Sequence, residues 1–184
     1  MPVIPYVKQT WTDGVSSASA ARLTVIEQGI HEVSLAPSVR VYHNATQLIT
    51  NNTETAVAFN SELWDTAAGV ADTMHDTATN NSRLTCRYAG KYLVEGSIEF
   101  AANATGQRYG AIRKNAGAGT YQILDRRLPH SSVAVQLIPH ALVDLAVNDF
   151  VELIAFQDSG AGLNIAASSA TSLYACSFMM VRVG

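Results

Sequence analysis

The sequence has few charged residues, few cysteines and no long apolar run. Charged side chains account for 15% of its 184 residues and the net charge is −3, so a basic surface for nucleic acid is not expected. No stretch approaches the roughly 18 apolar residues that a membrane-spanning helix needs. The opening residues MPVIPYVKQT lack the basic start and apolar core of a secretory signal. We therefore expect no nucleic-acid partner, no membrane insertion and no export by the usual secretory route.

The two cysteines, Cys86 and Cys176, are too few for a disulfide scaffold. Neither has the Cys-x-x-Cys or Cys/His spacing of a metal site. Each lies within a strand-like run, which favours two buried free thiols. A single bridge between strands that are neighbours in space is the alternative, and the sequence leaves both open.

Apolar and polar residues alternate with the two-residue period of β-strands from residue 39 onward. Turn-forming pairs such as Asn80-Asn81 and Asn148-Asp149 lie between the runs. No helical pattern separates the strands, which argues against a parallel sheet with crossover helices. About ten short strands in a chain that is 48% hydrophobic predict an all-β sandwich or jelly roll. The expected strands cover residues 39–43, 56–60, 83–88, 91–102, 107–115, 120–128, 132–145, 149–157, 163–167 and 172–183.

A short helix is expected ahead of these strands. Ser19 can cap it, the two alanines that follow favour helical backbone, and Pro37 prevents its continuation. A helix of about two heptads is marginal in water and needs a partner surface. We therefore divide the chain into an N-terminal anchor or stalk, residues 1–36, and a β-sandwich head, residues 37–184. The apolar stripe of the anchor helix consists of Leu23, Ile26, Ile30 and Val33.

Two stretches of the predicted head resemble C1q/TNF-like jelly rolls. In residues 83–115 a Gly-x-Tyr turn leads into an apolar strand, and the next strand ends in Lys-Asn. In residues 142–182 Asn148-Asp149 stand where the family has Gly-Asp, and a closing strand carries two aromatic residues. The resemblance covers about residues 38–184 and implies a C1q/TNF-like jelly-roll sandwich. The matching residues are Gly90, Tyr92, Lys114, Asn115, Tyr174 and Phe178.

The opening segment resembles the leader of bacteriophage tail-fibre and other virion appendage proteins. It departs from that leader at Thr24, where Asn is usual, and at Ser17, where Pro is common. The stretch from FNSELWDT to MHDTATNNSRLTC is also similar to C1q-like modules encoded by phages. The residues that carry the leader resemblance are Trp11, Asp13-Gly14, Ala21-Arg22-Leu23, Ile26-Glu27 and Gly29-Ile30.

Together, these resemblances imply a structural virion protein: a tail fibre, spike or decoration protein assembled in the host cytoplasm. They imply a homotrimer that is not an enzyme, carries no cofactor and binds other virion proteins through its N-terminal segment. Low charge and many small apolar residues agree with a buried threefold interface. The residues expected at that interface are Tyr92, Tyr174, Phe178 and Met180.

The polar loops are the expected contact with a host receptor. Loops tolerate variation and carry recognition while a sandwich holds them in place. Their Gly and Ala residues let a ligand approach, and their Asn, Gln, Asp and Tyr side chains can hydrogen-bond or stack. We expect one or more of the loops 103–107, 117–121 and 158–164 to contact a cell-surface glycan or protein, with Tyr109, Tyr121 and Asp158, in or beside these loops, as the binding residues.

Two other function classes stay open. One is a soluble C1q/TNF-like signalling ligand. The other is a virion-borne glycan hydrolase, which needs two carboxylates facing one cleft. The sequence alone does not say whether Glu95, Glu99 or Glu152 meet in this way.

The pair His75-Asp76 is the most catalytic-looking motif, with Ser82 nearby. Adjacent residues on a strand point to opposite faces, and no Gly-x-Ser-x-Gly elbow exists, so a polar loop is favoured over a catalytic site. Residues 75–82 and the turn at Asp158 offer oxygen ligands for calcium, but the EF-hand pattern is absent. We expect no metal.

Overall fold

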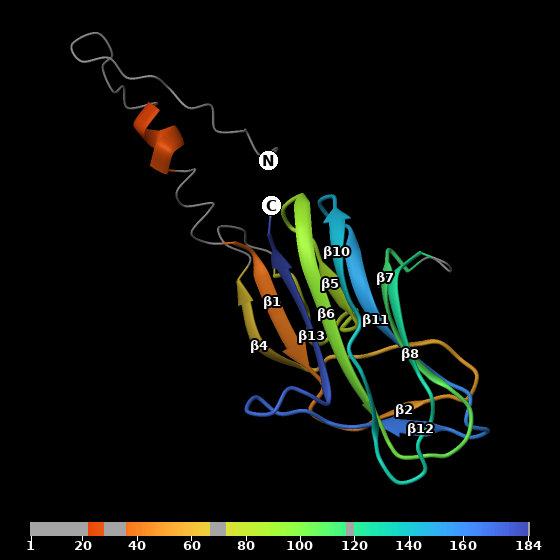
Figure 1. Ribbon diagram of the computed structural model, residues 1–184. Coiled ribbons are helices and arrows are strands. Elements are labelled where there is room, and N and C mark those ends of the chain that lie inside the picture. Colours follow the sequence, from red (N-terminus) through yellow and green to blue (C-terminus); the bar gives the residue numbers. More distant parts are fainter. Residues whose placement is uncertain (1–21, 28–35, 67–72, 117–119, 184) are drawn as a thin grey trace.

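The computed structural model describes residues 22–27, 36–66, 73–116 and 120–183. Two antiparallel sheets form a sandwich (Figure 1). The first sheet contains β1 (Ser38–Tyr42), β2 (Gln47–Ile49), β4 (Ser61–Thr66), β6 (Gly90–Phe100), β9 (Val135–Leu137), β10 (His140–Leu145), β12 (Leu163–Ile165) and β13 (Cys176–Arg182). The second contains β3 (Thr55–Ala56), β5 (Arg83–Thr85), β7 (Arg108–Lys114), β8 (Tyr121–Arg127) and β11 (Phe150–Gln157). The predicted all-β sandwich is confirmed.

The order of strands explains which segments become neighbours. The first sheet runs β2-β12-β6-β13-β1-β4, and β9 and β10 also pair with β6. The second runs β3-β11-β7-β8, and β5 also pairs with β11. Both sheets are antiparallel, so one face of each can pack on the core while the other meets water.

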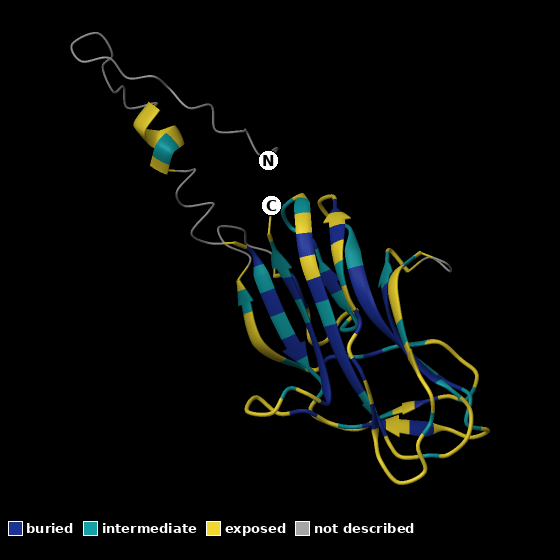
Figure 2. Cartoon of the chain, viewed as in Figure 1, coloured by how far each residue is buried: buried dark blue, intermediate teal, exposed yellow. Residues whose placement is uncertain are grey.

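The core lies between the sheets because strand side chains alternate between faces. On β6, Tyr92, Val94 and Ile98 point inward and are fully buried, as the banding of the strand in Figure 2 shows. Phe59 and Phe178 stack with ring centroids 5.7 Å apart. Burying each large apolar side chain stabilises the fold by about 1.5–3 kcal/mol, so this shared core holds the two sheets together.

Most strands lie where the alternation predicts them, and the differences have local causes. The expected strand 132–145 is two strands, β9 and β10, because Pro139 lies between them and has no N–H for a ladder. The segment 56–60 is mostly irregular. The sequence pattern missed β2 and β4: the first has three residues, and the second has a polar, largely exposed sequence, SELWDT.

The N-terminal helix is described only at residues 22–27, apart from the sandwich in Figure 1. There Leu23 is 48% exposed and Ile26 is half-buried. Ile30 and Val33 lie outside the described residues, so the apolar stripe and the division at residue 36 stay predictions. No helix in the described ranges is long and apolar enough to cross a membrane.

The sandwich has two distinct ends. Strand β1 begins and β13 finishes at one end, while residues 103–107 and 158–164 lie at the other (Figure 1). Residues 117–119 lie outside the described part of the chain. The three loops predicted for the receptor therefore do not gather at one end, because β7 and β8 place residue 120 at the end where β1 begins.

Candidate functional site

The outer face of the second sheet brings two of the predicted receptor residues together. Tyr109 on β7 and Tyr121 on β8 both donate their hydroxyl protons to the same oxygen, Oε1 of Glu54. Tyr109 also stacks on Phe156, with ring centroids 4.5 Å apart and planes 12° apart. The guanidinium carbon of Arg126 lies 5.7 Å from the centre of the Tyr109 ring. We call Glu54, Tyr109, Tyr121, Arg126 and Phe156 the tyrosine cluster.

The charge of Glu54 is stabilised by these contacts. Burial opposes its ionisation, but the hydroxyls of Tyr109 and Tyr121 and the nearby Arg113 outweigh that cost, so the pKa of Glu54 lies below its usual value. Burial and the bond to Glu54 raise the pKa of both tyrosines, which therefore keep their protons and act as donors. Both tyrosine hydroxyls are therefore occupied by Glu54 and are not free polar groups.

We expect acid to weaken this cluster. Because the folded-state pKa of Glu54 is lowered, its contribution is present above the unfolded-state pKa and is lost as the pH falls through the folded-state pKa. The double variant Tyr109→Phe/Tyr121→Phe should lose about 1 kcal/mol per hydroxyl at pH 7. The difference between the thermal midpoints of the double variant and of the parent should therefore shrink as the pH is lowered from 7 to 3. Tyr174→Phe, an exposed control, should follow the parent throughout; a gap that stays constant with pH would contradict the role given to Glu54.

A buried charge network continues from the tyrosine cluster across the same face. Arg113 lies 3.8 Å from Glu54 through Nη1 and 3.1 Å from Glu152 through Nη2. Glu152 is buried and also accepts from Ser82 at 3.2 Å and from Arg83 Nε at 3.4 Å. One carboxylate of β11 thus links strand β7 to strand β5. Sequence reasoning named Glu152 only as a possible catalytic carboxylate.

Asp158 is not part of this cluster. Its carboxylate accepts a hydrogen bond from the backbone N–H of Gln107. In return, the backbone N–H of Asp158 donates to the carbonyl of Gln107 at 3.4 Å. Gly106, in the loop 103–107, has a φ of +75°, and an added Cβ would collide with Asp158. Only glycine therefore suits this position, where the two loops come close together. Asp158 therefore links the loops 103–107 and 158–164 to each other, and its carboxylate is not free for a ligand.

The buried guanidinium of Arg108 holds the loop 103–107 in place through hydrogen bonds to its backbone. Arg108 is fully buried, and its Nη1 donates to the carbonyls of Thr105 and Gln107 at 2.9 Å each. Burial lowers the pKa of Arg108, while Asp158 opposes this effect. Nothing in the sequence pattern marks Arg108 as a core residue, because charged residues at strand starts are usually solvated.

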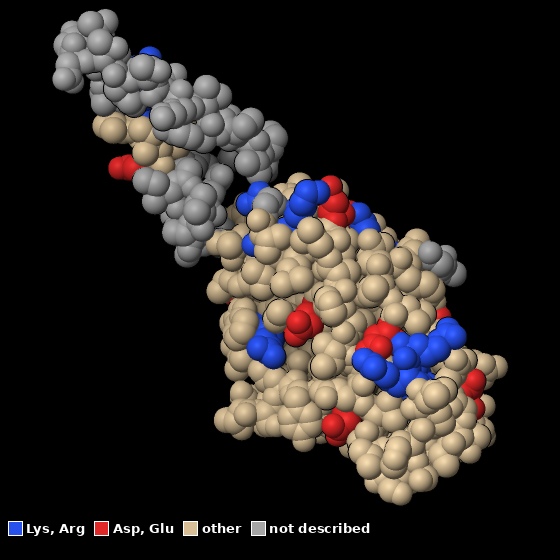
Figure 3. All heavy atoms as spheres, in the orientation of Figure 1, with Lys and Arg blue, Asp and Glu red and all other residues tan. Residues whose placement is uncertain are grey.

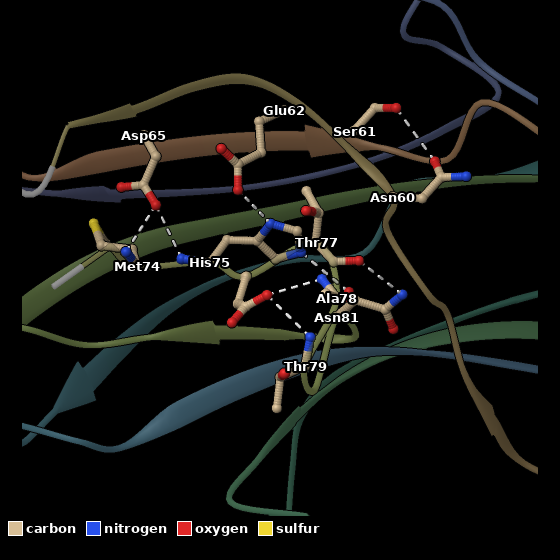
Figure 4. A network of polar contacts seen from close by, with 11 residues as sticks. Asn60, Ser61, Glu62, Asp65, Met74, His75, Thr77, Ala78, Thr79 and Asn81 are labelled. Atoms are coloured by element: carbon tan, nitrogen blue, oxygen red, sulfur yellow. Dashed lines mark hydrogen bonds and ion pairs between the residues drawn. The ribbon is translucent and has the colours of Figure 1, made fainter.

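His75 does not pair with Asp76. Its Nδ1 lies 2.8 Å from Glu62 Oε1 on β4, and its Nε2 lies 3.1 Å from the Asn81 carbonyl (Figure 4). Asp65 accepts the backbone N–H groups of Met74 at 2.7 Å and of His75 at 2.9 Å. The segment from residue 73 to 82 is therefore fastened to β4 by two carboxylates.

The remaining members of the predicted catalytic motif have structural partners of their own. Asp76 Oδ1 accepts the backbone N–H groups of Ala78 at 2.8 Å and Thr79 at 3.0 Å, a local turn (Figure 4). Ser82 donates to Glu152, on the other side of the segment. Within the described residues, His75, Asp76 and Ser82 do not form a hydrogen-bonded triad.

Comparisons with known proteins show which solved structures share this architecture. No family model matches the sequence, and no curated protein matches it. Among solved structures, the globular domain of zebrafish complement 1qA protein superimposes with a TM-score of 0.57 and 16% identity, over 80% of this chain and 98% of that chain. Murine APRIL gives a TM-score of 0.57 and 10% identity over 80% and 99% of the two chains. Eiger TNF from S. frugiperda gives 0.57 and 10% over 81% and 93%.

The fold is a C1q/TNF-like jelly roll. The predicted fold class is thereby confirmed, and at these identities the likeness concerns the fold alone.

Three of the four residues predicted at a trimer interface lie inside the jelly roll of a single chain. Tyr92, Phe178 and Met180 are buried on the inner face of the first sheet, and the Tyr92 hydroxyl donates to the Tyr88 carbonyl at 2.7 Å. That prediction is wrong for these three, because their side chains already fill the core between the sheets. Tyr174 differs: it is 60% exposed and stays available for contact.

The three carboxylates considered for a hydrolase do not converge on one cleft. Glu95 and Glu99 lie on the outer side of β6 in the first sheet, and Glu152 lies on the outer side of β11 in the second sheet. Glu95 and Glu99 are four residues apart on one strand, which separates their α-carbons by about 13 Å. A paired-carboxylate hydrolase site needs about 5–10 Å between the carboxyl groups.

The described residues hold no group of three or more His, Cys, Asp or Glu side chains placed to bind a metal ion. Both cysteines are buried free thiols, as the favoured interpretation held. Burial raises the pKa of Cys176 to about 12 and also raises the pKa of Cys86. Both thiols are therefore protonated and shielded at neutral pH.

We expect iodoacetamide at pH 8 to leave the folded protein unmodified, because thiolate is the reactive form and neither sulfur is accessible. Unfolding in guanidinium without a reductant should make both cysteines reactive, as intact mass would show. If the unfolded chain reacts only after reduction, the cysteines are bridged and the free-thiol assignment is wrong.

Proposed function

We propose that this chain is a homotrimeric, non-enzymatic appendage protein of a bacteriophage-like virion. In this proposal the N-terminal segment binds other virion proteins, and the C1q/TNF-like head recognises a cell-surface glycan or protein. The proposed trimer rests on one observation, the exposed apolar residues on the outer face of the first sheet. The phage assignment is supported by the leader-like sequence at Trp11 to Ile30.

The outer face of the first sheet offers an apolar row for contact with other copies. The pairing of β13 with β6 and of β6 with β10 sets Val181, Leu93 and Leu142 side by side. Leu142, on the edge strand β10, is 63% exposed, and Leu93, on the interior strand β6, is 37% exposed. Figure 3 shows much of this face as uncharged, with a charged cluster at its upper end and one acidic and one basic group lower on the face. An apolar face of this kind is typical of a surface buried by oligomerisation.

The next row of this face carries separated charges. The register sets Arg40, Met179 and Glu95 in line, with Trp64 beyond Arg40 and His140 beyond Glu95. Arg40 and Glu95 lie two strand spacings apart, about 10 Å, and do not form an ion pair with each other. Arg40 Nε is buried and lacks a hydrogen-bond partner within the described residues.

Light scattering at micromolar concentration tests the oligomeric state: a mass of three chains is expected, and a stable monomer would contradict the proposal. Immunogold labelling of purified particles tests the virion role. A chain restricted to residues 37–184 should stay folded and trimeric, yet be missing from particles. If particles made with the full-length chain carry no label, the virion assignment is wrong, and the proposed trimer is not affected.

A further inference from the structure

A polar groove opens on the flank of the second sheet, beside β5. Its volume is about 590 Å³, within the range of ordinary ligand sites. Its walls are the segment 73–80, the outer side of β5, and the turn before β11. This groove does not use the outer face of the first sheet, so a trimer formed through that face leaves the groove free.

Two guanidinium groups give the groove its charge. Arg83 and Arg87 both line it, and Thr85 lies between them in the sequence. Arg83 Nε faces Glu152, and Arg87 Nε donates to the Thr73 carbonyl at 2.7 Å. In the described part of the chain, the terminal Nη atoms of both groups have no acceptor. Each guanidinium is thus oriented through one nitrogen and keeps two others for a ligand.

Neighbouring groups hold these guanidiniums in place. The guanidinium carbon of Arg83 lies 4.1 Å from the centre of the Phe150 ring, and Phe150 pairs with Thr85 across the sheet. Asp76 is the only carboxylate among the described lining residues, and its Oδ1 already accepts two backbone N–H groups of its own turn. Arg83 is paired with Glu152 and Asp76 is charged, so the case for an acidic ligand rests on the Nη donors of Arg83 and Arg87, which face no acceptor in the described part of the chain.

The rest of the lining matches a saccharide better than a peptide. It carries the amides of Asn80 and Asn148 and the hydroxyls of Thr73, Thr79 and Thr85. Asn80 and Asn148 have φ values of 53° and 70°, so each sits at a fixed left-handed turn. The contacts of Glu62 and Asp65 hold the facing wall in place. A preorganised site loses less entropy when it binds a flexible sugar.

We propose that this groove binds a carboxylate-bearing saccharide, with Arg83 and Arg87 engaging the carboxylate and the amide and hydroxyl groups engaging sugar hydroxyls. Guanidinium groups bind carboxylates through paired N–H donors, which gives both charge and geometry. This inference deepens the proposed recognition role of the head by naming a ligand class, and it does not depend on the oligomeric state or on particle attachment.

The test is calorimetric titration of the full chain with oligomers of glucuronate, galacturonate and mannuronate and with N-acetylneuraminate, each beside its carboxyl-reduced counterpart. At least one acid should bind at least about tenfold more tightly than its reduced form. Arg87→Gln should weaken that binding about tenfold, and Thr85→Val should weaken it less. Arg127→Gln removes the same charge from β8, outside the groove, and should leave binding unchanged.

Three results would overturn the proposal: no acid binding better than its reduced form, equal losses in Arg87→Gln and Arg127→Gln, or tighter binding of inorganic phosphate or a tetraglutamate peptide. Unchanged thermal midpoints of Arg87→Gln and Thr85→Val would show that lost binding is not lost folding. Since trimer mass and particle labelling are measured separately, failure here leaves those parts of the proposed function intact.

Discussion

Replacing Glu152 with alanine is expected to destabilise the fold by about 3–5 kcal/mol, the usual cost of removing one partner from a buried ion pair. Glu152 is the shared acceptor of Arg113, Arg83 and Ser82, and its side chain is 5% exposed. Without it, Arg113 keeps only the longer contact to Glu54 and cannot reach water freely. Since a domain of this size is stabilised by about 5–15 kcal/mol, the loss is a large fraction.

The measurement is the thermal midpoint, which should fall by roughly 6–20 °C for a chain of this length. Glu152→Gln should lose less, because the amide oxygen still accepts one bond and the volume is kept. Asp144→Ala is the matched control: its carboxylate pairs with Lys91 at 3.6 Å, but its side chain is 77% exposed, so its removal should change stability by less than about 0.5 kcal/mol. Equal midpoints for Glu152→Ala and Asp144→Ala would mean that the network does not stabilise the fold.

Local alternation was enough to predict most strands of this protein but not which face of each strand is internal. On β6 the run Tyr92-Leu93-Val94 is apolar at successive positions, so both faces look suitable for a core. The inner face is decided by pairing with β13 and by packing against the second sheet, which a single strand does not reveal. The strand alone therefore does not distinguish Tyr92, which is fully buried in the core, from Leu93, which is exposed.

The candidate site shows the same limit in another form. Tyr109 and Tyr121 could be chosen from residue type alone, because tyrosines beside polar loops are common recognition residues. Glu54 could not, since it lies 55 residues from Tyr109 and 67 from Tyr121, and only the pairing of β3 and β7 with β11 brings it to them. The groove at β5 depends likewise on the contacts of Asp65 and Glu62 with the segment after residue 73.

Leu93→Glu is expected to convert the proposed trimer to monomers at micromolar concentration. Leu93 lies at the centre of the apolar row of the first sheet, between Val181 and Leu142, on the face through which we propose that the copies associate. Because Leu93 is 37% exposed in one chain, every copy would lose roughly 0.5–1 kcal/mol of apolar burial, and each would also have to bury a carboxylate that has no partner in that row. Leu142→Glu, at the more exposed end of the row, should weaken the trimer in the same direction.

A variant on the other sheet separates loss of assembly from loss of folding. Leu124 lies on the outer side of β8 and is 36% exposed, against 37% for Leu93, so Leu124→Glu makes the same chemical change at the same exposure. Leu124→Glu should remain trimeric by light scattering, whereas Leu93→Glu should be monomeric with an unchanged far-UV circular dichroism spectrum. If the result is reversed, the copies associate through the second sheet. The strands β7 and β11 separate β8 from the groove beside β5, so the saccharide test would keep its meaning in either assembly.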